Sequence, residues 1–216
     1  MSTETLEQPR LPGTLITLDG PGGAGKSTLT RLLTQRLRAA GWPVHATAGP
    51  SWAPLGELAR HGTDTYHGMA LACLCAADRH HQLAVEILPA LQEGQIVLCD
   101  RYLPSSLVLQ GLDGIPTETV WALNRGVYRP DLTLILTADP AVLAARLRQR
   151  GTHSRFERAA DSSLRESQLY LTAQAELHTA GWPTTTVETA TAPPEDAAAR
   201  IVSLIRPLAK ETRAAC

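Results

Sequence analysis

The chain has 216 residues, enough for one domain with a substantial hydrophobic core, and 44% hydrophobic with 19% charged residues is the composition of a globular protein. Its formal net charge of −1 gives no electrostatic reason to expect a nucleic-acid polymer or an anionic membrane as a partner. No apolar run approaches the roughly 18 residues of a membrane span, and the first residues lack the apolar core of a secretory signal, so we expect a cytoplasmic protein.

Apolar runs alternate with helix-forming segments along the whole chain. After a loose, disordered tail at residues 1–12, strands are predicted at Thr14–Leu18, Val44–Thr47, Gln95–Cys99, Leu132–Thr137 and Thr184–Val187. Helices are predicted at Lys26–Ala40, Tyr66–Leu91, Pro140–Gln149, Ser162–Thr179 and Pro194–Leu208, with a second tail at residues 211–216. This alternation indicates a single α/β domain at residues 13–210, with about five parallel strands and helices on both faces of the sheet. Such sheets bind ligands beyond the carboxyl ends of their strands.

A glycine-rich loop, "GPGGAGKS" at residues 20–27, separates the first strand from the first helix and satisfies the pattern G-x-x-x-x-G-K-[ST]. Glycines let the backbone adopt positive φ and approach an anion closely, while successive N–H groups surround the phosphate oxygens. Lys26 would reach the β and γ phosphates, and Ser27 would offer its hydroxyl to Mg²⁺. The loop therefore predicts a nucleoside triphosphate site formed by Gly20, Gly22, Gly23, Ala24, Gly25, Lys26, Ser27 and Thr28.

The strand at Gln95–Cys99 leads directly into two charged residues. Asp100 is the second candidate magnesium ligand, because it places a carboxylate beside the loop, and Arg101 suits a bidentate grip on a phosphate. The base-specifying N-K-x-D sequence of GTPases is absent, and there is no second domain for a motor ATPase. A small phosphotransferase is therefore favoured.

A second Asp-Arg pair, Asp78-Arg79, falls inside the predicted helix at Tyr66–Leu91. As an isolated dipeptide, it fits a solvated pair on a helix surface better than a ligand site.

The order and spacing of several motifs from Leu15 to about Arg206 resemble the thymidylate kinase family of P-loop nucleoside monophosphate kinases. The matching stretches are "LDGPGGAGKST", "PLGE" at 54–57, "AADR" at 76–79, "DRYLPSSLVLQG" at 100–111, "PDLTLILTADP" at 130–140, "RFE" at 155–157 and "APPEDAAARI" at 192–201. The resemblance implies a P-loop kinase fold and Mg²⁺- and ATP-dependent phosphorylation of a nucleoside monophosphate to a diphosphate. The default acceptor is dTMP. It also implies a homodimer, for which the apolar run Met69–Ala77 is a candidate contact, with core packing as the alternative.

The resemblance also implies an acceptor site. Arg101 would bind the acceptor phosphate, Arg79 the pyrimidine base, and Gln110 would line the pocket. The remaining residues assigned to this site are Asp19, Pro50, Cys75, Ser106 and Leu109.

The arginine-rich segment at residues 150–161 resembles the lid of such kinases. Family members with a basic lid lack a basic residue in the P-loop beyond the motif lysine, and this chain follows that pattern. Phosphoryl transfer requires alignment and neutralisation of oxygen charge in the transition state. Arg155 and Arg158 are the predicted catalytic lid residues, together with Lys26, Asp100 and Arg101. A solvated, arginine-rich helix end is the alternative.

Four positions depart from the family, and all four concern the acceptor. Ala48 stands where an arginine is usual, Gly22 where the P-loop commonly has Asp or Glu, Cys75 where an aromatic ring stacks on the base, and Leu109 where a tyrosine crowds the sugar. These changes leave two alternatives open: a kinase for a modified pyrimidine, a ribonucleotide or another small phosphate or phosphonate, and a nucleotide-binding module without catalysis.

Overall fold

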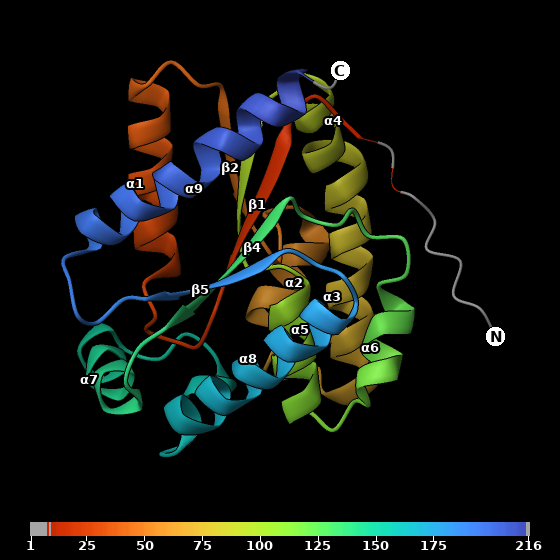
Figure 1. Ribbon diagram of the computed structural model, residues 1–216. Coiled ribbons are helices and arrows are strands. Elements are labelled where there is room, and N and C mark those ends of the chain that lie inside the picture. Colours follow the sequence, from red (N-terminus) through yellow and green to blue (C-terminus); the bar gives the residue numbers. More distant parts are fainter. Residues whose placement is uncertain (1–7, 9, 215–216) are drawn as a thin grey trace.

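The computed structural model describes residue 8 and residues 10–214, which form an α/β domain around one sheet (Figure 1). Its strands are β1 (Thr14–Asp19), β2 (Val44–Ala48), β3 (Ile96–Asp100), β4 (Leu132–Thr137) and β5 (Thr184–Glu188). All the pairings are parallel, in the order β2-β3-β1-β4-β5. This arrangement confirms the predicted fold class, and it places the carboxyl ends of β1 and β3 side by side at the centre of one edge.

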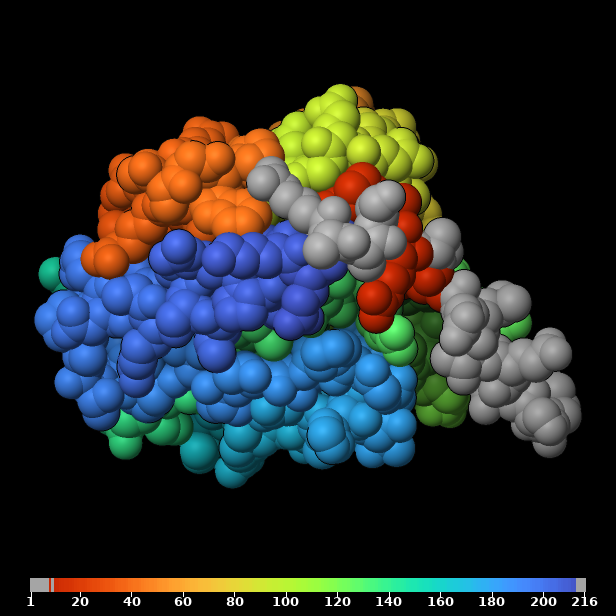
Figure 2. Space-filling view, turned by 45° about the horizontal axis from the view of Figure 1, so that its top comes forward, coloured from red at the N-terminus to blue at the C-terminus, as the bar shows by residue number. Residues whose placement is uncertain are grey.

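Helices cover both faces of the sheet (Figure 1). They are α1 (Lys26–Ala39), α2 (Pro54–His61), α3 (Gly68–Gln82), the π-helical turn η1 (Leu83–Ile87), α4 (Leu88–Gln92), α5 (Leu103–Leu112), α6 (Thr117–Leu123), α7 (Pro140–Arg150), the 3₁₀ turn η2 (Arg155–Glu157), α8 (Ser162–Thr179) and α9 (Pro194–Ala214). The deep-blue α9 lies along the surface in Figure 2 beside the orange residues near position 40.

The core consists of two layers, one on each side of the sheet. Alternate residues of β1 point to opposite faces, so Ile16 and Leu18 pack with α1 and α9, while Leu15 packs with the helices of the other side. On that second side, Tyr102 and Tyr170 are among the largest fully buried side chains. Both flank the sheet edge that carries Asp100 and Arg101.

The long helix predicted at Tyr66–Leu91 is divided in the structure into α3, η1 and α4. Pro89 has no N–H, and its ring crowds the carbonyl four residues earlier, so the regular helical hydrogen-bond ladder cannot continue through it. The π-helical turn directly before Pro89 accommodates this break.

The ends of the domain differ from the expected tails. Helix α9 continues to Ala214, so residues 211–214 are helical rather than loose. In the expected N-terminal tail, Gln8 donates a hydrogen bond from Nε2 to the carbonyl of Arg129 at 2.9 Å, whereas residues 1–7, 9, 215 and 216 lie outside the described part of the chain. Within the described part, no helix combines the length and apolar character needed to cross a bilayer.

Candidate active site

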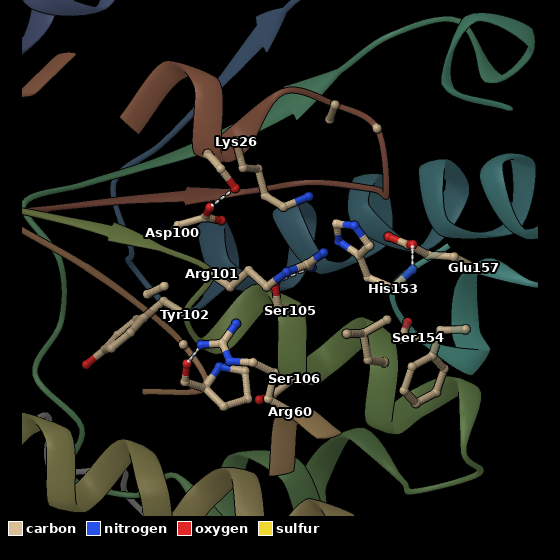
Figure 3. Close-up of a pocket in the computed structure, with 18 of the residues that line it drawn as sticks. Lys26, Arg60, Asp100, Arg101, Tyr102, Ser105, Ser106, His153, Ser154 and Glu157 are labelled. Atoms are coloured by element: carbon tan, nitrogen blue, oxygen red, sulfur yellow. Dashed lines mark hydrogen bonds between the residues drawn. The ribbon is translucent and has the colours of Figure 1, made fainter. Parts of the chain in front are cut away.

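A cavity of about 610 Å³ opens at the carboxyl edge of the sheet. The P-loop from Gly23 to Thr28, the strand-end pair Asp100-Arg101 and residues of α3 and α5 line it. Figure 3 shows Lys26 and Arg101 pointing from two different elements into the same space. The structure thus brings the predicted donor and acceptor residues to one site.

The P-loop joins β1 to α1 through a run of left-handed backbone. Gly20, Gly23 and Gly25 have φ values of 144°, 81° and 89°, which only glycine adopts without strain. At Gly20 a Cβ would also lie 2.5 Å from the carbonyl oxygen of Leu136. The glycines that the motif requires are therefore explained by the backbone conformation of the loop.

Lys26 is buried at the first turn of α1. Its Nζ donates hydrogen bonds to the carbonyls of Gly20 and Pro21, both at 2.8 Å. Burial lowers the pKa of Lys26 to about 7, and the nearby Arg101 acts in the same direction. The ammonium is thus held inside its own loop, beside the helix N-terminus where a phosphate would bind.

Ser27 and Asp100 form a pair of oxygen ligands suited to magnesium. The Ser27 hydroxyl donates to Asp100 Oδ2 at 2.6 Å, while Asp100 Oδ1 is buried and accepts no hydrogen bond from the described residues. A hydroxyl and a carboxylate are ligand types that Mg²⁺ prefers, and it usually keeps waters and phosphate oxygens as its other ligands. The described residues contain no cluster of three or more His, Cys, Asp or Glu side chains that fits a metal ion, so these two residues would hold magnesium together with the nucleotide.

Arg101 has a φ of 74°, although it is not glycine. Its N–H donates to the carbonyl of Leu18 at 2.9 Å, and its guanidinium reaches the hydroxyls of Ser105 and Tyr170 at 3.4 Å. Burial opposes the charge, but Tyr170 and nearby carboxylates outweigh it and raise the pKa of Arg101. Arg101 is therefore a permanent cation on the cavity wall.

Asp19, which the sequence assigned to the acceptor site, lies one layer behind the cavity wall. Its Oδ1 accepts hydrogen bonds from the N–H groups of Tyr102 and Ser105 and from the Ser105 hydroxyl, at 2.7–3.0 Å. Burial raises its pKa. Asp19 therefore fixes the turn that carries Arg101, and it is not among the residues that line the cavity.

The other predicted acceptor residues all line the cavity: Pro50, Cys75, Arg79, Ser106, Leu109 and Gln110. Arg79 donates to the Asn124 side chain, to the Tyr102 carbonyl at 3.1 Å and to the Ser106 hydroxyl at 2.7 Å. Gln110 Oε1 is buried and has no hydrogen-bond partner among the described residues, which leaves an acceptor for a ligand N–H.

The sequence alone suggested that Asp78 and Arg79 could form a solvated pair on the surface of a helix. In the structure both side chains are buried, so this interpretation is wrong. Asp78 accepts hydrogen bonds from the N–H of Ser51 at 2.6 Å and from its hydroxyl at 2.5 Å. The carboxylate therefore ties the loop after β2 to α3, next to the Arg79 side of the cavity.

The lid arginines separate into two groups. Arg155 donates to Asp113 and to the Thr63 carbonyl, and Arg158 pairs with Asp64, so both guanidiniums hold the lid to the acceptor side. Arg150 lines the cavity itself. In this conformation Arg155 and Arg158 are not brought to Lys26, and their catalytic role stays a prediction.

Two arginines that line the cavity, Arg60 and Arg146, were not predicted from the sequence. Arg60 of α2 lines the cavity and stacks over Trp52 at 4.0 Å from the ring centroid. Its buried Nε–H finds no hydrogen-bond acceptor among the described residues. Arg146 of α7 donates to the carbonyl of Gly23 at 3.2 Å. The one sequence signal that could have pointed to Arg60 is Ala48, which stands where the family usually has an arginine.

The fold, the P-loop and a buried arginine across one cavity are the features of a P-loop kinase. A thymidylate kinase family model matches residues 18–201. The chain is 39% identical over 197 residues to a probable thymidylate kinase of Pyrobaculum aerophilum, covering 88% of this chain and 95% of the relative. It is 38% identical over 160 residues to a probable thymidylate kinase of Caldivirga maquilingensis (72% and 78%), and 41% identical over 141 residues to a thymidylate kinase of Xanthomonas oryzae (64% and 62%). The chain belongs to the thymidylate kinase family and is a nucleoside monophosphate kinase, as the motifs predict.

Proposed function

We propose that the chain transfers the γ-phosphoryl group of ATP to dTMP, giving ADP and dTDP. The observation that carries this proposal is the single cavity, which has the P-loop at one end and both Arg101 and Arg79 at the other. The relatives named thymidylate kinase support the same acceptor. They lend no support to a non-standard acceptor or to a module without catalysis.

The residues act by alignment and by neutralising charge. Lys26 binds the β and γ phosphates once it leaves the carbonyls of its own loop. Arg101 grips the phosphate of the acceptor and holds it in line with the γ phosphate. Ser27 and Asp100 would hold Mg²⁺, which would supply positive charge against the donor oxygens. Among the lid arginines, Arg150 is the first candidate for stabilising the transition state, because it lines the cavity.

Acceptor recognition rests on polar groups at the far wall of the cavity. The buried Gln110 amide presents a free Oε1 to an N–H of the base, and Arg79 stands beside it. A ligand that leaves Oε1 unpaired loses affinity, because a buried polar atom without a partner is costly.

We further propose a cytoplasmic, Mg²⁺-dependent homodimer. Support for the dimer comes from apolar side chains left exposed on α2, α3 and η1, namely Leu55, Leu58, Met69 and Val85. Sedimentation of the wild-type protein at micromolar concentration tests this, and a single species at the mass of one chain contradicts it.

Steady-state assays of ADP release test the acceptor, with dTMP, dUMP, UMP, CMP and hydroxymethylated nucleotides compared at equal concentration. We expect the highest kcat/KM with dTMP. Lys26→Ala should abolish transfer with every acceptor while its thermal unfolding stays cooperative. If another nucleotide is turned over efficiently and dTMP is not, that nucleotide is the acceptor and the proposal of dTMP is wrong. ATP binding without turnover of any acceptor would refute the kinase activity.

A further inference from the structure

Helix α8 begins directly after the lid segment and packs against α5 beside the site. Two of its polar residues, Glu166 and Tyr170, are four positions apart and therefore lie on one face of the helix. They are 2% and 0% exposed, and neither lines the cavity. Any part they take in the reaction must therefore act through other residues.

Glu166 binds the donor side of the site. Its Oε2 accepts the N–H of Gly22 in the P-loop at 2.9 Å. Burial raises the pKa of Glu166, although the Gly22 hydrogen bond and the charges of Arg101 and Lys26 oppose this shift. Keeping a carboxylate here costs folding free energy that an apolar side chain would not cost. Folding stability alone therefore does not explain this residue.

Tyr170 binds the acceptor side of the site. Its hydroxyl lies 3.0 Å from Ser105 Oγ, and both hydroxyl oxygens lie 3.4 Å from the same nitrogen, Nη1 of Arg101. Figure 3 shows Ser105 beside the Arg101 side chain. The guanidinium is thus held against one hydroxyl from α5 and one from α8, which restrict where it can point.

A closed path of buried contacts joins the P-loop to the surroundings of Arg101. It runs from Gly22 to Glu166, along one turn of α8 to Tyr170, and on to Ser105 and Asp19. Asp19 directly precedes the P-loop, so the path starts and ends on the donor side. Glu166 also favours the charged forms of Lys26 and Arg101, which otherwise repel each other across the site.

We propose that Glu166 and Tyr170 are positioning residues through which α8 fixes Arg101 relative to the P-loop. The inference rests on the proposed function, because this placement matters only if Arg101 and the P-loop hold the two phosphates of one transfer. Phosphoryl transfer depends on alignment of the two groups, and a misplacement of about 1 Å can cost on the order of 100-fold in rate.

Single variants separate alignment from binding. Tyr170→Phe removes only the hydroxyl, and Glu166→Leu removes the carboxylate at similar volume. Each should lower kcat by roughly 10- to 100-fold and change the KM for ATP and for dTMP less than about threefold, since neither residue touches a substrate. Glu166→Gln should lose less than Glu166→Leu, because its amide oxygen can still accept the Gly22 N–H.

Two further variants test whether the residues act together and through the site. Tyr170→Phe/Glu166→Leu should lose little more than the worse single variant, because each change alone already breaks the path. Glu176→Gln is the matched control. It removes a carboxylate further along the same helix that does not line the cavity, and it should leave kcat unchanged.

Thermal unfolding distinguishes this role from a role in folding. Glu166→Leu should melt at about the temperature of the wild type, because the cost of burying the carboxylate is removed together with its hydrogen bond. Single variants that melt lower and keep the wild-type kcat would overturn the inference and leave the proposed function standing. Losses that multiply in the double variant, or an equal loss in Glu176→Gln, would overturn it as well.

The wild type decides which acceptor these measurements use. If the acceptor panel identifies a nucleotide other than dTMP, the proposed acceptor is wrong, and the comparison of kcat with that nucleotide supports or overturns the inference in the same way. A wild type that turns over no acceptor refutes both.

Discussion

ATP binding should be accompanied by proton uptake at Lys26. In the free protein, burial lowers the pKa of this ammonium to about 7, and its hydrogen bonds go to two carbonyls of its own loop. The phosphates of ATP bring several negative charges to the same place and favour the protonated form. Above pH 7 the free protein therefore lacks a proton that the complex carries.

The size of the effect follows from the pKa of about 7. At pH 8 about 90% of free Lys26 is neutral, so binding should take up about 0.9 proton. Since uptake becomes harder as pH rises, ATP affinity should fall on the order of 50-fold between pH 7 and pH 9. Below pH 7 the dependence should flatten, because Lys26 is already protonated.

Calorimetric titration with a non-hydrolysable ATP analogue and Mg²⁺ measures this directly. The slope of the binding enthalpy against the ionisation enthalpy of the buffer gives the number of protons taken up at pH 8. Lys26→Arg is the matched control, because its guanidinium stays charged throughout. Equal proton uptake by the wild type and by Lys26→Arg would refute the reasoning, since the proton would then belong to another group.

Three further outcomes are expected. Arg101→Ala should raise the KM for the acceptor by roughly 100-fold, as expected for lost charged hydrogen bonds, and a change confined to the KM for ATP would contradict its assignment. Cys75→Phe combined with Leu109→Tyr should improve dTMP over UMP by about tenfold, because the tyrosine would crowd the 2′ hydroxyl of a ribonucleotide whereas the new ring would stack on either base. An unchanged ratio across the acceptor panel would remove Leu109 from the sugar pocket. Gly56→Ala should cost at least about 1–3 kcal/mol in urea unfolding, because its Cβ would lie 2.2 Å from the carbonyl oxygen of Ser51, and an unaltered midpoint would show that this packing is not as tight as described.

The strands were the most predictable part of the fold. Leu132–Thr137 has the same bounds in the structure as in the sequence, because a buried parallel strand is a continuous apolar run between breaks. Helix α5 was not predicted, since it is buried on nearly all sides and shows no apolar stripe. The residues at Pro54–His61 form a helix too short to produce a clear periodicity.

The P-loop and the cavity-lining acceptor residues were located from motifs, because these residues act within a few positions of a strand end. The lid was less predictable. Arg155 reaches Asp113 and the carbonyl of Thr63, which are remote in sequence, so its pairing depends on how the lid folds across the cavity.

The left-handed backbone of Arg101 costs the native state on the order of 1–3 kcal/mol, which the surrounding hydrogen bonds must offset. A glycine at position 101 would remove this backbone strain, but it would also remove the positive charge that we propose binds the acceptor phosphate. The strained residue after β3 thus lowers folding stability in favour of the proposed activity. Selection for thermal stability alone would favour a residue other than arginine there, at the expense of affinity for the acceptor.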